Sequence, residues 1–259
     1  GNVLMFKKNN LKQRVRQNEP SLGMWIALTD PAIAEIAGHA GYDFAIIDLE
    51  HGMADLKDAT NMLRALAPFE TTAMVRVPGH DPDFLKRALD IGAQTLMVPM
   101  VETADQARAI VSACRYPPLG VRGYAARGVR ASGYGIDENY ADQAADELFI
   151  ALQIESVQGV DNAAEIAAVD GVDLIFIGAA DLSGNMGLLA QTGRQEVVDQ
   201  INRCVESVAS VGKPLGTIPR PDRSGIELIE DGFIVLTGGV DVGFLRDAAL
   251  EDVRIFNNR

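Results

Sequence analysis

The chain has 259 residues, of which 47% are hydrophobic and 23% charged, and its formal net charge is −13. This composition is typical of a globular protein. No apolar run approaches the roughly 20 residues that a membrane-spanning helix needs. The negative charge argues against nucleic acid and anionic membranes as partners, because both repel an acidic protein. A small anionic substrate is compatible with it if a cation or a few arginines reverse the local charge.

The two cysteines, Cys114 and Cys204, lie far apart in segments of helical character. This arrangement indicates reduced core thiols and not a disulfide. The N-terminal segment is basic, but no apolar stretch follows it, so no secretory signal is visible. We therefore expect a cytoplasmic protein.

Short β-rich runs alternate with amphipathic helical segments along the chain. The predicted strands are Leu22–Leu28, Phe44–Leu49, Thr72–Val77, Thr95–Met100, Leu148–Glu155, Val172–Gly178, Pro214–Ile218 and Phe233–Leu236. The predicted helices are Ala32–Ala40, Phe84–Ile91, Ala104–Cys114, Val160–Val169, Glu196–Val211 and Asp222–Asp231. Several helices stop at a glycine, as at Gly41 and Gly92, which closes a helix in the left-handed conformation. Continuous Val, Ile and Leu runs indicate strands covered on both faces.

This alternation predicts an α/β fold, a (β/α)₈ TIM barrel. We expect one domain over residues 1–259, with a short N-terminal helical arm and a C-terminal helix. The alternative is an open doubly wound sheet, which more often carries a glycine-rich turn after its first strand. The segment after the first strand here, ALTDPAIAE, has no such turn. We therefore favour the barrel.

Polar side chains stand at the carboxyl ends of the predicted strands, where barrel enzymes assemble their active sites. The stretch IIDLEHG places Asp48, Glu50 and His51 directly after a buried strand. Packing alone does not favour this, because a buried charge is costly unless it is paired or bound to a metal. The next strand ends with Arg76, which suits either a binding role or a structural ion pair. Of the three histidines, only His51 falls on the predicted rim, and histidine is the usual general base near neutral pH.

The fifth and sixth predicted strands contribute two carboxylates. Gln153 and Glu155 stand two residues apart and share one face of the fifth strand, and Asp181 follows the sixth. Two carboxylates from neighbouring strands, completed by water, form an all-oxygen site for a hard divalent ion. Asp181 could instead merely cap the next helix. The residue pattern leaves both interpretations open.

Six motifs, in this order, resemble the metal-dependent class II pyruvate aldolases of the HpcH/HpaI aldolase family. They are DLEHG, VRVPG, LDIGAQTLMVPMVET, RYPPLGVRG, LQIES and FIGAADLS, and the resemblance runs from about Leu22 to about Asp247. It implies 4-hydroxy-2-oxoheptanedioate or 2-keto-3-deoxy sugar acid aldolase chemistry, with pyruvate and an aldehyde as products. It also implies the same barrel assembled as a homo-oligomer, usually a hexamer with active sites near subunit contacts.

The resemblance also implies roles for individual residues. Glu155 and Asp181 correspond to the metal ligands, and Arg76 to the residue that binds the pyruvyl part of the substrate. His51, paired with Asp48, corresponds to the acid/base. The implied cofactor is a divalent ion, Mg²⁺ or Mn²⁺ first and Co²⁺ as a further candidate.

A second set of residues corresponds to the substrate-binding part of the family's site. Gln153 lines the metal site, and Gly178, Ala179 and Ala180 follow the sixth strand next to it. The family commonly has proline where this chain has Ala179. The segment GYAARGVRASGYGI is a variable part of the family, and the identity of the substrate depends on it.

The chemistry is consistent with these residues. Breaking a C–C bond next to a ketone needs a stabilised enolate, through either a Schiff-base lysine or a divalent ion. No lysine stands at the carboxyl end of a predicted strand, which favours the metal route. Arg76 would add a fixed positive charge beside the developing oxyanion. His51 would move the proton of the aldol hydroxyl, with Asp48 fixing its tautomer.

Two other functions stay open. The first is a citrate-lyase-β-like enzyme that acts on an acyl-CoA, although the coenzyme's phosphates would favour a more basic surface than a net charge of −13 provides. The second is a non-catalytic binder of pyruvate-like acids, which would have no need of the base His51.

The segment GYAARGVRASGYGIDENY is predicted to meet the aldehyde half of the substrate, because we place it in the loop after the fourth strand. It contains Arg127 and Arg130 and follows Arg122. We expect Arg127 or Arg130 to bind a polar or anionic aldehyde. The alternative is that these arginines only neutralise an acidic surface.

Overall fold

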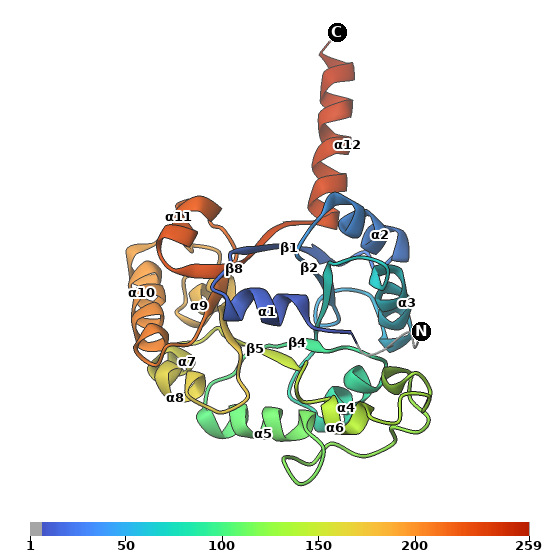
Figure 1. Ribbon diagram of the computed structural model, residues 1–259. Coiled ribbons are helices and arrows are strands. Elements are labelled where there is room, and N and C mark those ends of the chain that lie inside the picture. Colours follow the sequence, from blue (N-terminus) through green and yellow to red (C-terminus); the bar gives the residue numbers. More distant parts are fainter. Residues whose placement is uncertain (1–6, 259) are drawn as a thin grey trace.

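A closed ring of eight parallel strands, in sequence order, forms the centre of the molecule (Figure 1). The computed structural model describes residues 7–258. The strands are β1 (Ser21–Ile26), β2 (Phe44–Asp48), β3 (Thr72–Arg76), β4 (Thr95–Val98), β5 (Phe149–Ile154), β6 (Leu174–Ile177), β7 (Leu215–Thr217) and β8 (Phe233–Val240). β8 pairs in parallel with β1 and closes the ring, so the sheet has no free edge. The predicted TIM barrel is confirmed.

Helices surround this ring, except the first and the last, which lie across its mouth and project from it, respectively (Figure 1). The helices are α1 (Asn10–Arg16), α2 (Pro31–Ala40), α3 (Leu56–Leu66), α4 (Pro82–Asp90), α5 (Ala104–Cys114), η1 (Arg130–Ser132), α6 (Tyr140–Gln143), α7 (Val157–Asp161), α8 (Ala163–Ala167), α9 (Ala179–Asn185), α10 (Gln195–Ser210), α11 (Gly225–Glu230) and α12 (Asp241–Asn257). The predicted helix Val160–Val169 is two short helices that meet at Asn162. The predicted helix Asp222–Asp231 begins later, after Ser224, which forms a capping box with Glu227.

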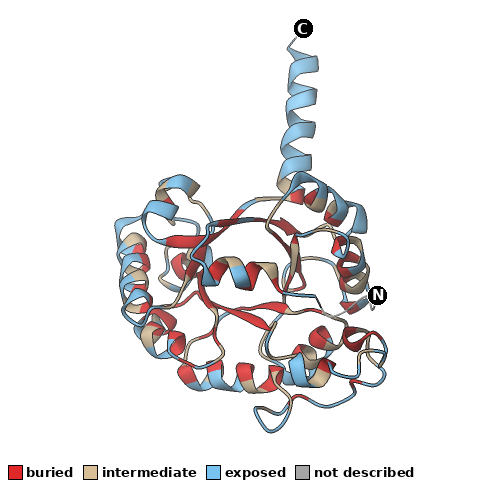
Figure 2. Ribbon diagram, viewed as in Figure 1, coloured by how far each residue is buried: buried red, intermediate tan, exposed pale blue. Residues whose placement is uncertain are grey.

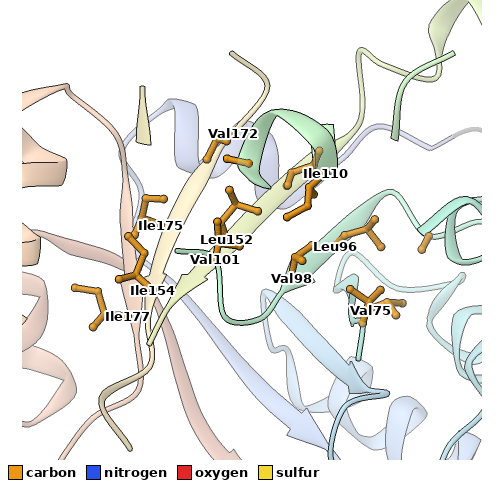
Figure 3. Close-up of a cluster of buried hydrophobic side chains, with 14 of the residues drawn as sticks. Val75, Leu96, Val98, Val101, Ile110, Leu152, Ile154, Val172, Ile175 and Ile177 are labelled. Atoms are coloured by element: carbon orange, nitrogen blue, oxygen red, sulfur yellow. The ribbon is translucent and has the colours of Figure 1, made fainter. Parts of the chain in front are cut away.

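The strands separate two apolar layers. Alternate side chains point inward and form an interior cluster that includes Phe44, Met74, Phe149 and Phe176. The other side chains point outward against the helices, and Figure 3 shows this outer layer where β3 to β6 face α5. Most strand residues are buried in this way on both faces (Figure 2). The continuous apolar runs of the sequence follow from this burial.

Helix α1 lies across the amino-terminal mouth of the barrel (Figure 1). Asn9 caps it and donates a 2.8 Å hydrogen bond from Nδ2 to Oγ1 of Thr95, the first residue of β4. Lys12 donates from Nζ to the carbonyl oxygen of Leu148, just before β5, at 2.8 Å. The carboxyl ends of the strands, where barrel active sites form, therefore lie at the opposite mouth.

Helix α12 does not fold back onto the barrel but projects from it (Figure 1). It is exposed along nearly its whole length (Figure 2). Within residues 7–258, no helix combines the length and the apolar character needed to cross a membrane. Cys114 and Cys204 are buried free thiols, as predicted, and burial raises the pKa of each to about 12.

Candidate active site

An ion pair between neighbouring strands lies at the carboxyl-terminal mouth. Asp48 ends β2, Arg76 ends β3, and the two residues pair in register. Arg76 donates from Nε to Oδ1 of Asp48 at 2.9 Å and from Nη2 to Oδ2 at 2.7 Å. Its guanidinium lies 4.4 Å from the ring centroid of Trp25 on β1, in cation–π contact. Burial favours a higher pKa for Asp48, but Arg76 outweighs it and holds that pKa below its usual value.

The pairing of His51 differs from the prediction. Both oxygens of Asp48 are engaged by Arg76, and Oδ1 also accepts from the backbone N–H groups of Glu50 and His51, at 3.1 and 3.3 Å. Asp48 therefore shapes the turn and does not orient the imidazole. The side chain beside the imidazole is Glu50, whose Oε1 lies 3.7 Å from Nε2 of His51.

Glu50, unassigned from the sequence, links Arg76 and His51. Its Oε2 lies 3.1 Å from Nη1 of Arg76, while its Oε1 faces His51. The pKa of Glu50 is raised, chiefly by its partial burial. Arg76 and His51 act to lower this pKa, while the charges of Asp48 and Asp181 act to raise it. Since the His51 side chain is 67% exposed, the imidazole is open to a substrate on the rim.

Glu155 is a deeply buried carboxylate of the mouth, 3% exposed and directly after the last residue of β5. Its Oε2 accepts a 2.9 Å hydrogen bond from the backbone N–H of Met100. Burial raises the pKa of Glu155 to about 7. The hydrogen bond from Met100 acts to lower this pKa, and the charge of Asp181 acts to raise it. A Cβ on Gly178 would lie only 2.3 Å from Oε1 of Glu155. Glycine at this position therefore leaves room for the carboxylate.

Asp181 lies in the first turn of α9, exposed at the same mouth. The residue before α9, Gly178, is its N-cap and makes no side-chain capping hydrogen bond, and Ala179 and Ala180 begin the helix. Glu50 and Asp181 both raise the pKa of Glu155. The three carboxylates thus concentrate negative charge in one place, which a bound cation would relieve.

The donor atoms present fit a hard divalent ion. Gln153 is 2% exposed, and its Oε1 has no hydrogen-bond partner among the described residues, whereas buried acceptors are normally satisfied. Together with Glu155 and Asp181 it provides oxygen donors, which Mg²⁺ and Mn²⁺ prefer. No cluster of three or more Asp, Glu, His or Cys able to hold a metal occurs between residues 7 and 258. Substrate and water oxygens would therefore have to complete the coordination.

Three residues of this mouth were not predicted as part of the site. Trp25 stacks on Arg76. The feature of the sequence that could have indicated it is that the one tryptophan of the chain falls in a predicted strand. His80 follows β3 and lies on the rim, contrary to the expectation that His51 is alone there. Its Nε2 is 2.6 Å from the carbonyl oxygen of Pro99. The next residue, Met100, has φ +50° and directs its N–H at Glu155.

The arginine-rich segment does not lie where the sequence predicted. It follows α5, not β4, and leads into β5, so within the chain it lies at the amino-terminal mouth. Arg122 is buried there, 2.8 Å from Asp90 and stacked on Tyr116. Arg130 donates from Nη1 to the carbonyl oxygen of Ile91, just before β4, at 2.9 Å. Helix-to-strand loops and strand-to-helix loops lie at opposite ends of a parallel barrel, so these arginines do not reach the site of their own chain.

Known proteins are similar to this chain in sequence and in fold. The HpcH/HpaI aldolase/citrate lyase family model matches residues 21–248. The chain is 41% identical over 252 residues to a 4-hydroxy-2-oxovalerate aldolase from Novosphingobium aromaticivorans, an overlap of 97% of this chain and 95% of that protein. It is 39% identical over 251 residues to a 2-keto-3-deoxy-L-rhamnonate aldolase from Escherichia coli O6:K15:H31, an overlap of 96% and 94%.

Solved structures agree with the sequence matches. A HpcH/HpaI aldolase/citrate lyase family protein from Burkholderia cenocepacia J2315 superposes with a TM-score of 0.91 at 37% identity, covering 95% of this chain and all of that one. A more distant citrate lyase β subunit from M. tuberculosis, solved with oxaloacetate and magnesium, shares the fold at a TM-score of 0.57 and 19% identity, covering 88% of this chain and 93% of that one. The matches to the family and to its aldolases extend over nearly the whole chain. This protein therefore belongs to the HpcH/HpaI aldolase/citrate lyase family.

Proposed function

We propose that this enzyme, a carbon–carbon lyase of the aldolase type, cleaves a 4-hydroxy-2-keto acid to pyruvate and an aldehyde, and catalyses the reverse condensation. One observation carries the proposal. A guanidinium fixed by two carboxylates, Arg76, lies on the same mouth as Glu155, Asp181 and the exposed His51. A positive charge for the keto acid's carboxylate, ligands for an ion and a proton carrier thus lie at one mouth.

We propose Glu155 and Asp181 as the residues that hold the divalent ion, with Gln153 lining the site. Mg²⁺ or Mn²⁺ is the expected ion and Co²⁺ a further candidate, because all of the donors are oxygen atoms. A bound ion would supply Lewis-acid stabilisation of the enolate charge. Gly178, Ala179 and Ala180 would line the substrate side, where the absence of larger side chains leaves room for the keto acid.

Arg76 contributes positive charge that does not have to reorganise. Its contacts with Asp48, Glu50 and Trp25 fix the guanidinium before substrate arrives. A charge fixed in this way beside a developing oxyanion contributes several kcal/mol to catalysis. Asp48 thus acts through Arg76 and through the backbone of the turn.

His51 takes the proton from the 4-hydroxyl group of the substrate. The C3–C4 bond then breaks, the carbonyl group of the aldehyde forms, and the bonding electron pair remains on the enolate of pyruvate. Protonation at C3 completes the formation of pyruvate. Glu50 faces the imidazole at 3.7 Å and orients it, and its negative charge stabilises the imidazolium that results.

The enzyme is expected to assemble from several copies. The outward-projecting α12 carries exposed apolar side chains, namely Phe244, Leu245, Leu250, Val253 and Ile255. The barrel meanwhile leaves apolar side chains uncovered on the elements next to β8, namely Leu22 on β1, Ile36 on α2, and Ile226 and Ile229 on α11. Reciprocal docking of α12 between two copies would bury both surfaces.

A hexamer needs a second interface to join such dimers. The segment between α5 and β5 exposes Leu119, Val121, Tyr124 and Ile136. These side chains lie at the amino-terminal mouth, away from α12. We propose that this surface joins three dimers into the hexamer. In that assembly the arginines of one copy's segment would approach the active site of a neighbouring copy.

A panel of 4-hydroxy-2-keto acids, assayed for pyruvate release with and without a chelator, tests the proposed reaction. Pyruvate release from at least one member that stops in chelator and returns with Mg²⁺ or Mn²⁺ is the expected result. Release that persists unchanged in chelator would refute the metal route, and no release from any member would refute the reaction.

A further inference from the structure

We propose that Asp241, the first residue of α12, is a positioning residue that holds the turn carrying His51 in its working geometry. This turn, residues 48–52, is called the catalytic turn below. The inference rests on the proposed role of His51 and adds a residue from the opposite end of the sequence. Asp241 acts through the loop that follows β1, residues 27–30.

Asp241 is a buried carboxylate, and its hydrogen-bond partners within residues 7–258 are all backbone N–H groups. It is 6% exposed, and its Oδ1 accepts from Ala27 at 3.0 Å and from Val242 at 2.8 Å. Its Oδ2 accepts from Leu28 at 2.9 Å. Hydrogen bonds from backbone N–H groups to a carboxylate are charge-assisted and stronger than neutral ones. Asp241 therefore fastens the loop after β1 to the end of β8.

This loop needs such a fastening because its backbone is strained. Thr29 has φ +63°, a left-handed conformation that a β-branched residue adopts at a cost of about 1–3 kcal/mol. Asp30 then caps α2 by accepting from the N–H of Ala32 at 2.8 Å. The loop is thus held at one end by α2 and at the other by Asp241, with the strained residue between.

The fastened loop lies directly behind the catalytic turn. A Cβ built on Gly52 would lie 3.3 Å from the carbonyl oxygen of Ala27 and 2.2 Å from that of Asp48. The last residue of the turn, Gly52, therefore packs its backbone against the loop. If Ala27 moves, the backbone next to His51 and Glu50 loses its support on that side.

The ion-binding side of the mouth does not share this support. Glu155 is held by Met100, and Asp181 by α9, on strands and helices far from β1 in the ring. Loss of Asp241 should therefore impair the step that needs His51 more than enolate formation from pyruvate. This separation distinguishes a positioning role from a general loss of structure.

The experiment compares Asp241→Asn and Asp241→Ala with Asp247→Asn, an exposed acid of the same helix. All variants are assayed in the full-length, metal-loaded enzyme for aldol cleavage and for exchange of the C3 hydrogens of pyruvate with solvent. We expect kcat of cleavage to fall roughly 10- to 100-fold in Asp241→Ala, the range that a displacement of about 1 Å produces. Asp241→Asn, which keeps one acceptor oxygen, should fall less. Exchange should change less than about threefold, and Asp247→Asn should match the wild type.

His51→Ala is the reference that separates this inference from the proposed function. If His51→Ala itself retains full cleavage, the base assignment fails, and with it the basis of the inference. If His51→Ala abolishes cleavage but Asp241→Ala retains it, the inference alone is overturned. Cleavage and exchange that fall equally in both Asp241 variants, together with a lower melting temperature, would reduce Asp241 to a structural residue and also overturn it.

Discussion

Arg76 is the residue on which most contacts of the mouth converge. Asp48 holds it through two parallel hydrogen bonds, Glu50 holds its third nitrogen, and Trp25 covers one face of the guanidinium. A planar guanidinium donates two parallel hydrogen bonds to one carboxylate while its third nitrogen faces another, whereas an ammonium group has no such bidentate geometry. The identity of this cation therefore matters as much as its charge.

Replacing Arg76 with lysine should lower kcat by at least about 100-fold, because the lost hydrogen-bonding fork leaves the positive charge displaced from the oxyanion. Steady-state cleavage kinetics and exchange of the C3 hydrogens of pyruvate should both show the loss. Arg108→Lys, on the exposed face of α5, is the matched control. Wild-type rates in Arg76→Lys would refute the assigned role.

Substitutions of Glu155 and Asp181 test the proposed ion site through metal binding, without an activity assay. Glu155→Gln and Asp181→Asn should each weaken Mn²⁺ binding at least about tenfold, because each removes one anionic oxygen ligand. Titration calorimetry, or the electron paramagnetic resonance signal of free Mn²⁺, measures this affinity directly. The exposed Glu165→Gln serves as control. Unchanged affinity in Glu155→Gln would move the ion to other ligands.

At the scale of elements, α12 differs from the other helices because it projects from the barrel and does not fold back onto it. The strands before β8 are followed by helices in the ring around the barrel, whereas α12 leaves this ring (Figure 1). Its exposed apolar side chains remain in water unless a second copy covers them. Its starting residue, Asp241, at the same time holds the loop beside the catalytic turn. The proposed assembly surface and the proposed positioning residue therefore belong to the same helix.

The double substitution Leu245→Glu and Leu250→Glu should reduce the molar mass of the particle in solution, because charges on this face oppose its burial between copies. Size-exclusion chromatography with light scattering gives the mass at several concentrations. Asp252→Ala, on the same helix, is the control and should assemble like the wild type. A double variant of unchanged mass would show that α12 is not part of the interface.

At the scale of the whole molecule, the two thiols report on the integrity of the barrel. Burial raises the pKa of Cys114 and Cys204 to about 12, whereas an exposed thiol has a pKa of about 8.5. Since the thiolate is the reactive form, neither should be alkylated by iodoacetamide at pH 8 in the folded protein. Both should react after unfolding. Mass spectrometry follows the alkylation of each thiol. Rapid alkylation of either thiol in the native protein would contradict this burial.

The same shift predicts how stability depends on alkaline pH. The folded thiols have a higher pKa than the unfolded ones, so they contribute stability fully below about pH 8.5. That contribution is lost as the pH rises towards 12, because the unfolded chain ionises first. Melting temperatures of the wild type should therefore fall more steeply above pH 9 than those of Cys114→Ala. Parallel curves would show that the Cys114 thiol does not contribute.

The sequence by itself determined the architecture and the position of the chemistry. Continuous apolar runs, helices that stop at glycine and the absence of a glycine-rich first turn predict a barrel, because these are local properties of each segment. Polar residues directly after a strand lie at its carboxyl end in any parallel barrel. Arg76, Glu155 and Asp181 therefore lie at one mouth in the structure, as their places in the sequence predicted.

The tertiary structure decided which of these side chains touch. Asp48 pairs with Arg76 across the β2–β3 register and not with the nearby His51, because two strands 28 residues apart in sequence bring a bidentate partner within 2.7 Å. It also decided that Arg130 lies at the far mouth, since this depends on whether a loop follows a strand or a helix. The link from Asp241 to Ala27 spans 214 residues. Spacing along a chain cannot encode such contacts, because they arise only when strands from distant segments close into one ring.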